Sequence, residues 1–135
     1  MKNDKTDNHE QIFWEEIDRL FPDMIKAIAS LSKKSYLSIT NLRTGITWWS
    51  ERAMDYFGMK ENYTIRSMEK ANRKIHPDDV ATFKRGFKER VDGKNLDTAW
   101  EYRIQDGDSY NRFNAMARVL YDEQKQPFII IIRYY

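Results

Sequence analysis

Hydrophobic residues recur at helical spacing in the first quarter of the chain, after a polar lead over residues 1–8. Intervals of three and four residues, which place side chains on one face of an α-helix, separate Phe13, Ile17, Leu20, Met24, Ala27 and Leu31. Proline is tolerated in the first turn of a helix but costs about 3 kcal/mol in its interior. Pro22 therefore predicts two helices, over residues 9–20 and 22–33.

A pattern typical of strands follows these helices. Residues 36–40 (YLSIT) place Leu37 and Ile39 on one face of a short strand. Turn-forming residues at 41–45 (NLRTG) and a second apolar run at 46–49 (ITWW) complete a predicted β-hairpin.

A short helix is predicted directly after the hairpin. Ser50 is a good N-cap and Gly58 suits the C-terminal end of such a helix. Met54 and Phe57 form its buried side. Residues 59–76 are predicted to be short helical pieces joined by loops.

The sequence His-Pro-Asp-Asp at residues 76–79 predicts the start of a longer helix. Proline fits a first helical position, and acidic side chains favour the positive N-terminal end. The expected buried face comprises Val80, Phe83, Phe87 and Val91, and the expected solvated side comprises Lys84, Arg85, Lys88 and Arg90.

Three strands are predicted in the last third of the chain. Residues 98–104 and 109–121 alternate between apolar and polar positions, and the Asp-Gly pair at 106–107 is a hairpin signal. Residues 128–132 (FIIII) are apolar on both faces of a strand. Such a strand is expected in the centre of a sheet, with the N-terminal helices covering its outer side.

This order of elements predicts an α+β fold, in which a five-stranded antiparallel sheet has helices on one face and N-terminal capping helices on the other. The length of 135 residues suits one domain, and 41% hydrophobic residues are enough for a core. The 23 basic and 21 acidic residues leave a net charge of +2, too weak to attract nucleic acid or a membrane. The sequence has no cysteine, no apolar signal segment and no membrane-length run, so a cytoplasmic location is expected.

Seven segments, in this order and spacing, resemble the PAS family. The most recognisable is Ile75–Asp79 (IHPDD) opening a long helix, followed by E-Y-R-I at residues 101–104 and a hairpin. The full set is YLSIT, ITWWS, SERAMDYFG, IHPDDVATFKRGFKER, TAWEYRI, YNRFNAMARVLYD and QPFIIII. The resemblance implies a PAS domain over residues 35–135, preceded by a helical cap over residues 1–34.

The resemblance also implies a bacterial sensory module rather than an enzyme. Domains of this family sense a small ligand, redox state or light, or simply dimerise, and they pass the result to an output domain. The N-T-G pattern of the first hairpin resembles PAS domains fused to GGDEF diguanylate cyclases or histidine kinases. A homodimer and a C-terminal GGDEF output domain are therefore expected, although the chain has no GGDEF motif and residues 133–135 (RYY) do not match the family's D-I-T-like tripeptide.

Two interpretations of the aromatic residues stay open. One is a ligand pocket lined by Trp48, Met54, Phe57, Phe83, Phe87, Trp100 and Tyr102. The other is that these large side chains fill the core completely, which would make the domain a ligand-free interaction module. Trp49 is expected to face the opposite way, and the predicted cap and dimer interface comprises Phe13, Ile17, Leu20, Met24, Leu31 and Trp49.

Other chemistry has little support in the sequence. His76 with Asp78 and Asp79 is interpreted as a helix start rather than a metal site, and His76 is poorly placed to bind haem. A flavin adduct of the light-sensing kind needs a cysteine. A small α+β-cone isomerase or dehydratase would need a general base in an apolar pocket, but Glu101 and Arg103 fall on the alternate face of their strand. No catalytic residue, metal, haem or cysteinyl-flavin adduct is expected, and the ligand stays unidentified.

Overall fold

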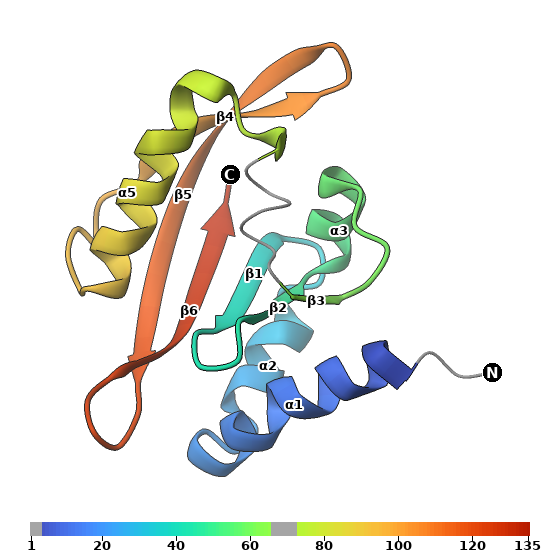
Figure 1. Cartoon of the computed structure of the whole chain (residues 1–135), viewed down its shortest axis with the longest axis vertical. Helices are drawn as coiled ribbons and strands as arrows, with labels where there is room; N and C mark the ends of the chain where they lie inside the picture. The colour runs from blue at the N-terminus through green and yellow to red at the C-terminus, as the bar shows by residue number, and fades with distance from the viewer. Residues whose placement is uncertain (1–3, 66–72) are drawn as a thin grey trace.

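One curled antiparallel sheet organises the computed structural model, which describes residues 4–65 and 73–135. Within these residues the sheet has the strand order β3-β2-β1-β6-β5-β4 (Figure 1). The strands are β1 (Tyr36–Asn41), β2 (Ile46–Trp49), β3 (Tyr63–Ile65), β4 (Trp100–Asp106), β5 (Ser109–Tyr121) and β6 (Pro127–Tyr134). The last strand lies in the centre and pairs with β1 on one side and β5 on the other, which confirms the prediction for residues 128–132.

Strand β3 was not predicted. It adds a sixth strand to the five expected, and it lies within residues 59–76, which were predicted to be short helical pieces joined by loops. This strand pairs with β2, and Trp49 and Asn62 extend the pairing because the Trp49 amide donates to the Asn62 carbonyl at 2.8 Å. Tyr, Thr and Ile are aromatic or β-branched and fit a pleated surface well, a local preference that the prediction overlooked. Residues 66–72 of the same prediction lie outside the described residues.

Helices α3 (Glu51–Phe57) and α5 (Val80–Val91) pack on the inner face of the sheet, and a short 3₁₀ turn, η1 (Pro77–Asp79), leads into α5. Ser50 caps α3 as predicted, because its Oγ accepts a hydrogen bond from the Ala53 amide at 3.3 Å. The same Oγ accepts from the Leu37 amide at 3.1 Å, which ties the start of α3 to β1.

Helices α1 (Asp4–Leu20) and α2 (Met24–Leu31) lie together on the outer face, over β1, β2 and β3. Figure 1 shows them at the opposite end of the molecule from α5. They complete a second hydrophobic cluster, whose fully buried members include Phe13, Ile17, Ile25, Ile39 and Phe128. The expected cover is therefore present over the start of the final strand, where Phe128 and Ile129 belong to the outer cluster. Within the described residues, no helix is both long and apolar enough to cross a membrane.

The predicted apolar stripe does not continue from α1 into α2. Phe13 and Ile17 are fully buried, but Met24 is 42% exposed and Leu31 is 88% exposed. The cause is the break between the helices, where Asp23 takes a left-handed backbone conformation with φ of 65°. This break rotates the second helix relative to the first, so that Ile25 and Ala29 face the sheet in place of Met24 and Leu31. The start of α1 also differs, since it begins at Asp4 rather than at residue 9.

Candidate functional site

The interior between the sheet and the helices is almost completely filled. The cavity at this place has a volume of about 10 Å³ and is lined by Phe57, Ile75, Phe83, Tyr102, Ile104 and Tyr134. Such a volume holds about one water molecule. Phe83 packs edge-on against Tyr102 with ring centroids 4.8 Å apart, and Phe57 packs against Tyr134 at 5.8 Å. Packing by these rings leaves no ligand-sized space here within the described part of the chain.

The predicted pocket residues separate into three groups in the structure. Phe57, Phe83, Trp100 and Tyr102 come together in the inner core. Met54 and Phe87 are half-buried and pack against the edge of that core. Trp48 belongs to the outer cluster instead.

The predicted orientations of Trp48 and Trp49 are exchanged. Trp48 is the cross-strand partner of Ile39, and directly paired residues of an antiparallel sheet point to the same face. Since Ile39 belongs to the outer cluster, Trp48 also points outward, and Trp49 points into the inner core against Phe57. The sequence offered two adjacent tryptophans without a signal for which face each one takes.

Two buried phenols lie at the small cavity. Burial raises the pKa of Tyr102 well above its usual value and raises the pKa of Tyr134 to about 12. The Tyr134 hydroxyl lies 3.2 Å from Ser38 Oγ on the neighbouring strand β1. Both phenols are therefore neutral at physiological pH, and they provide hydrogen-bonding groups rather than charge.

Arg90 is buried, contrary to the prediction that it lies on the solvated side of its helix. Its guanidinium lies over the Trp100 ring at 3.9 Å from the centroid, and it donates to the carbonyl oxygens of Gly86 at 3.0 Å and Thr98 at 2.6 Å. A guanidinium stacks well on an indole, so this cation is part of the packing that joins α5 to β4. Sequence periodicity carries no signal for such a contact.

Asp79 has a role beyond the predicted helix start. Its two carboxylate oxygens accept hydrogen bonds from Arg103 Nε at 2.8 Å and Nη2 at 3.0 Å, and Oδ2 also accepts from the Arg103 amide at 2.9 Å. These hydrogen bonds clamp the turn before α5 to strand β4. The Arg103 side chain holds the pKa of Asp79 at about 2.

Replacing Asp79 by asparagine is expected to lower the free energy of unfolding at pH 7 by about 1 kcal/mol, because the pair is partly exposed and water screens it. The native pKa lies below the usual Asp value, so the carboxylate stabilises the fold above about pH 4 and loses this effect as the pH falls toward 2. Urea unfolding of both proteins should therefore show a difference at pH 7 that shrinks in acid. A difference that grows between pH 4 and 2 would contradict this account.

His76 takes part in the same turn. Its Nδ1 accepts from the Asp78 amide at 3.1 Å, and its ring packs on Tyr110 with centroids 4.6 Å apart. Among the described residues, no three His, Cys, Asp or Glu side chains are grouped so that they could hold a metal ion.

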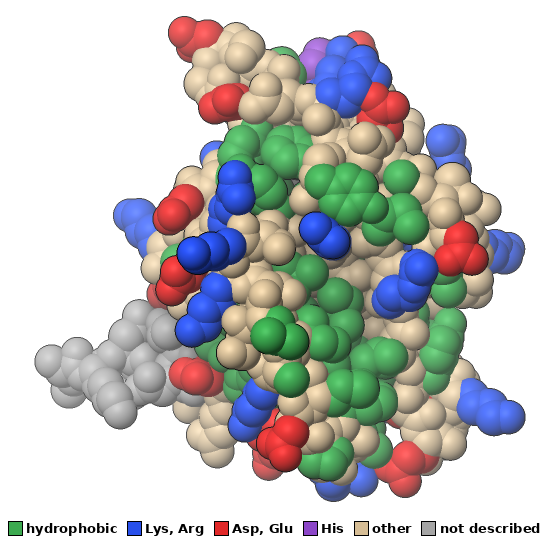
Figure 2. Space-filling view, turned by 180° about the vertical axis from the view of Figure 1, so that it is seen from behind, with side chains coloured by type: hydrophobic (Ala, Val, Ile, Leu, Met, Phe, Trp, Pro, Cys, Tyr) green, Lys and Arg blue, Asp and Glu red, His purple; other side chains and the backbone are tan. Residues whose placement is uncertain are grey.

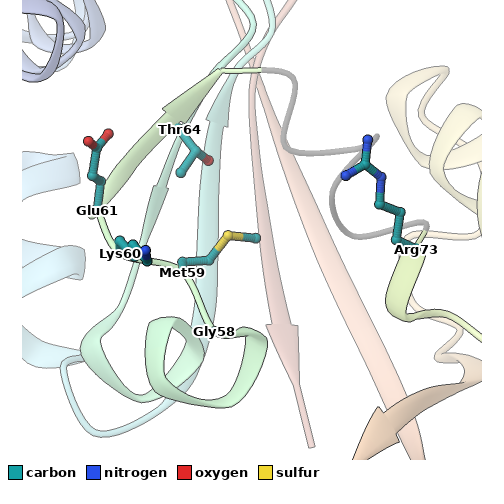
Figure 3. Close-up of a pocket in the computed structure, with 6 residues that line it drawn as sticks. All are labelled: Gly58, Met59, Lys60, Glu61, Thr64 and Arg73. Atoms are coloured by element: carbon teal, nitrogen blue, oxygen red, sulfur yellow. The ribbon is translucent and has the colours of Figure 1, made fainter.

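Two larger hollows that described residues line lie outside the core. The first, called here the α3 hollow, has a volume of about 390 Å³ and is lined by Gly58, Met59, Lys60, Glu61, Thr64 and Arg73 (Figure 3). The second, called the outer groove, has a volume of about 340 Å³ and is lined by Leu37, Met116, Ala117, Arg118, Ile131, Arg133 and Tyr135. Neither was anticipated as a pocket, because each depends on the way separate segments meet in three dimensions.

Comparison with known proteins identifies the fold and the family. A family model described as the PAS fold matches residues 46–132. A sensory box histidine kinase/response regulator from Burkholderia thailandensis E264 superimposes with a TM-score of 0.57 and 17% identity, over 81% of each chain. The N-terminal domain of a diguanylate cyclase with a PAS/PAC sensor from Marinobacter aquaeolei gives a TM-score of 0.59 and 15% identity, over 73% of this chain and 91% of that one.

A third solved structure, the PAS domain of a protein from Colwellia psychrerythraea, gives a TM-score of 0.54 and 17% identity, over 84% of this chain and 96% of that one. The comparison with curated proteins yields no match. At these identities the solved structures show a shared fold, and the family model spans more than half of the sequence. The chain therefore belongs to the PAS family, whose members are sensory modules.

Proposed function

We propose that this PAS domain is a regulatory input module that pairs with a second copy of itself and controls an output domain, a GGDEF diguanylate cyclase. The observation that carries the pairing is the contrast between its two faces. The inner core is filled, with a cavity of only about 10 Å³, whereas the outer face keeps an open groove beside the N-terminal helices. This contrast favours an interaction module over a sensor that holds its ligand inside the core.

The outer groove combines apolar and basic groups. Met116 and Ile131 line it with half-buried apolar side chains, and Tyr135 is 54% exposed. Arg133 lies over the Tyr135 ring at 5.4 Å, and it forms no ion pair with another described residue. Seen from behind, hydrophobic side chains gather down the middle of the molecule with Lys and Arg side chains among them (Figure 2). A groove that combines apolar and basic side chains offers a partner both hydrophobic contact and charge pairing.

The exposed side of α1 has the complementary chemistry. Ile12 is 43% exposed and Glu15 is exposed three residues later, on the same side of the helix. Residues 4–20 contain six acidic and two basic side chains in the sequence DKTDNHEQIFWEEIDRL. Helix α1 and the outer groove both lie on the outer face of the sheet, so a two-fold axis between them can place each helix on the partner's groove.

Disrupting this contact is expected to convert a dimer into a monomer. Ile12→Glu should raise the dimer dissociation constant at least tenfold, because it places a charge in an apolar contact. Glu15→Arg and Arg133→Glu should each weaken pairing, and the two together should restore it through the exchanged charges. Analytical ultracentrifugation over a concentration series measures each constant.

Lys84→Glu, at an exposed position of α5, is the matched control and should leave the dissociation constant unchanged. A wild-type chain that stays monomeric at high micromolar concentration would refute the pairing. A double variant that pairs no better than either single variant would refute the proposed partner surfaces.

The identity of the output domain rests on the fold relatives, since one is the sensor domain of a diguanylate cyclase and another belongs to a histidine kinase/response regulator. The full-length natural protein, incubated with GTP, should form cyclic di-GMP. If the protein instead phosphorylates itself with ATP and forms no cyclic di-GMP, the output domain is a histidine kinase.

The described residues give little support to the alternative hypothesis of a small α+β-cone isomerase or dehydratase. Glu101 pairs with Arg112 at the surface at 2.6 Å, and Arg103 is held by Asp79. The residues lining the inner cavity carry no carboxylate and no imidazole that could act as a general base.

A further inference from the structure

Basic side chains that take no part in the proposed dimer contact line the α3 hollow. Lys60 and Arg73 line it. Lys74 lies beside them, because its Nζ is 3.5 Å from the position that a Cβ would take on Gly58. Within residues 4–65 and 73–135, none of these three basic side chains forms an ion pair.

The acidic residue of the lining, Glu61, turns its carboxylate away from the hollow (Figure 3). The Arg73 guanidinium, in contrast, extends toward Met59 and Thr64 from the opposite wall (Figure 3). A ligand that enters the hollow would therefore meet the basic side chains of its lining.

Thr64 adds a hydrogen-bond donor at the base of the hollow. Its side chain is buried, and Oγ1 accepts a hydrogen bond from Trp49 Nε1 at 2.7 Å. A hydroxyl that accepts a hydrogen bond still has its own proton to donate. The same bond connects the hollow to Trp49, which packs in the inner core against Phe57.

We propose that the α3 hollow binds a small organic anion that carries a carboxylate or phosphate group. Arg73 can bind two oxygens of such a group at once, Lys60 and Lys74 add charge, and Thr64 donates a hydrogen bond. Met59 supplies an apolar contact for the rest of the molecule. The volume of about 390 Å³ lies at the small end of known ligand sites, which suits a compact metabolite.

Isothermal titration of the purified chain with citrate, succinate and inorganic phosphate, at one pH and one ionic strength, tests this site. At least one anion should bind at one per chain with a change in tryptophan fluorescence, and neutral glycerol should not. Lys60→Gln combined with Arg73→Gln should weaken binding at least tenfold, which corresponds to about 1.4 kcal/mol. Citrate or succinate binding indicates a carboxylate site, and phosphate binding indicates a phosphate site.

Lys33→Gln combined with Lys84→Gln changes the net charge equally at exposed positions elsewhere and should keep the affinity. Failure of all three anions to bind would overturn the proposal, and so would an equal loss in the control, which would show that binding follows overall charge. Thermal unfolding of each variant confirms that it is folded. The site shares no lining residue with the outer groove, so its failure is separate from any failure of the proposed pairing.

Discussion

Replacing Phe13 by alanine is expected to lower the free energy of unfolding by about 3–5 kcal/mol, which is the usual cost of removing a fully buried phenyl ring. Phe13 is 0% exposed and packs edge-on against Trp14 at 4.9 Å and against Tyr63 at 5.5 Å. Its carbonyl oxygen also accepts from Asn41 Nδ2 at 3.3 Å. These contacts join α1 to strands β3 and β1, so helix and sheet should unfold together.

Urea unfolding, followed in parallel by tryptophan fluorescence and circular dichroism at one protein concentration, measures this effect. Gln11→Ala, at an exposed position of the same helix, is the matched control and should change stability by less than about 0.5 kcal/mol. If Phe13→Ala costs less than about 1 kcal/mol, the outer cluster is not part of the cooperative unit.

Gly86→Val is expected to destabilise the domain by about 3 kcal/mol, the upper part of the range for overpacking a core. A Cβ at this position would lie 2.9 Å from Trp100 Cδ1, 3.0 Å from Trp100 Nε1 and 3.1 Å from Arg90 Nη1. The indole cannot move away easily, because it is buried between the Arg90 guanidinium and the Phe83 ring. Close approach of α5 to β4 therefore requires glycine here.

Ala81→Val, at an exposed position of α5, isolates the intrinsic cost of valine in a helix, which is about 0.6 kcal/mol. Intrinsic helix propensity slightly favours valine over glycine, so a larger loss in Gly86→Val than in Ala81→Val, measured by chemical denaturation, reports the steric contact. Equal destabilisation of the two variants would mean that the contact with Trp100 does not restrict residue 86.

The sequence was sufficient to predict most of the fold. Periodicity identified the described strands except β3, and the two-faced apolar run at 128–132 identified the central strand, because an uncovered face there would expose isoleucine side chains. The helix start at residues 76–79 also followed from local chemistry, since proline and two acids fit the first turn.

The candidate sites were much harder to predict from the sequence. The faces of Trp48 and Trp49 depend on the register of β1 and β2, which a pair of identical residues does not specify. The burial of Arg90 depends on its stacking partner 10 residues later in the chain, and the bond between Asp79 and Arg103 depends on where β4 runs. Both hollows form where non-adjacent segments meet, so no motif marks them.

The central position of β6 has a mechanical consequence. Its backbone is hydrogen-bonded on both edges, and its side chains enter both hydrophobic clusters, with Phe128 in the outer one and Tyr134 in the inner one. Slippage by a single residue would turn Ile130 and Ile132 away from the inner cluster. Because the two clusters share this strand, a change in the packing of either cluster acts on the strand that leads to Tyr135.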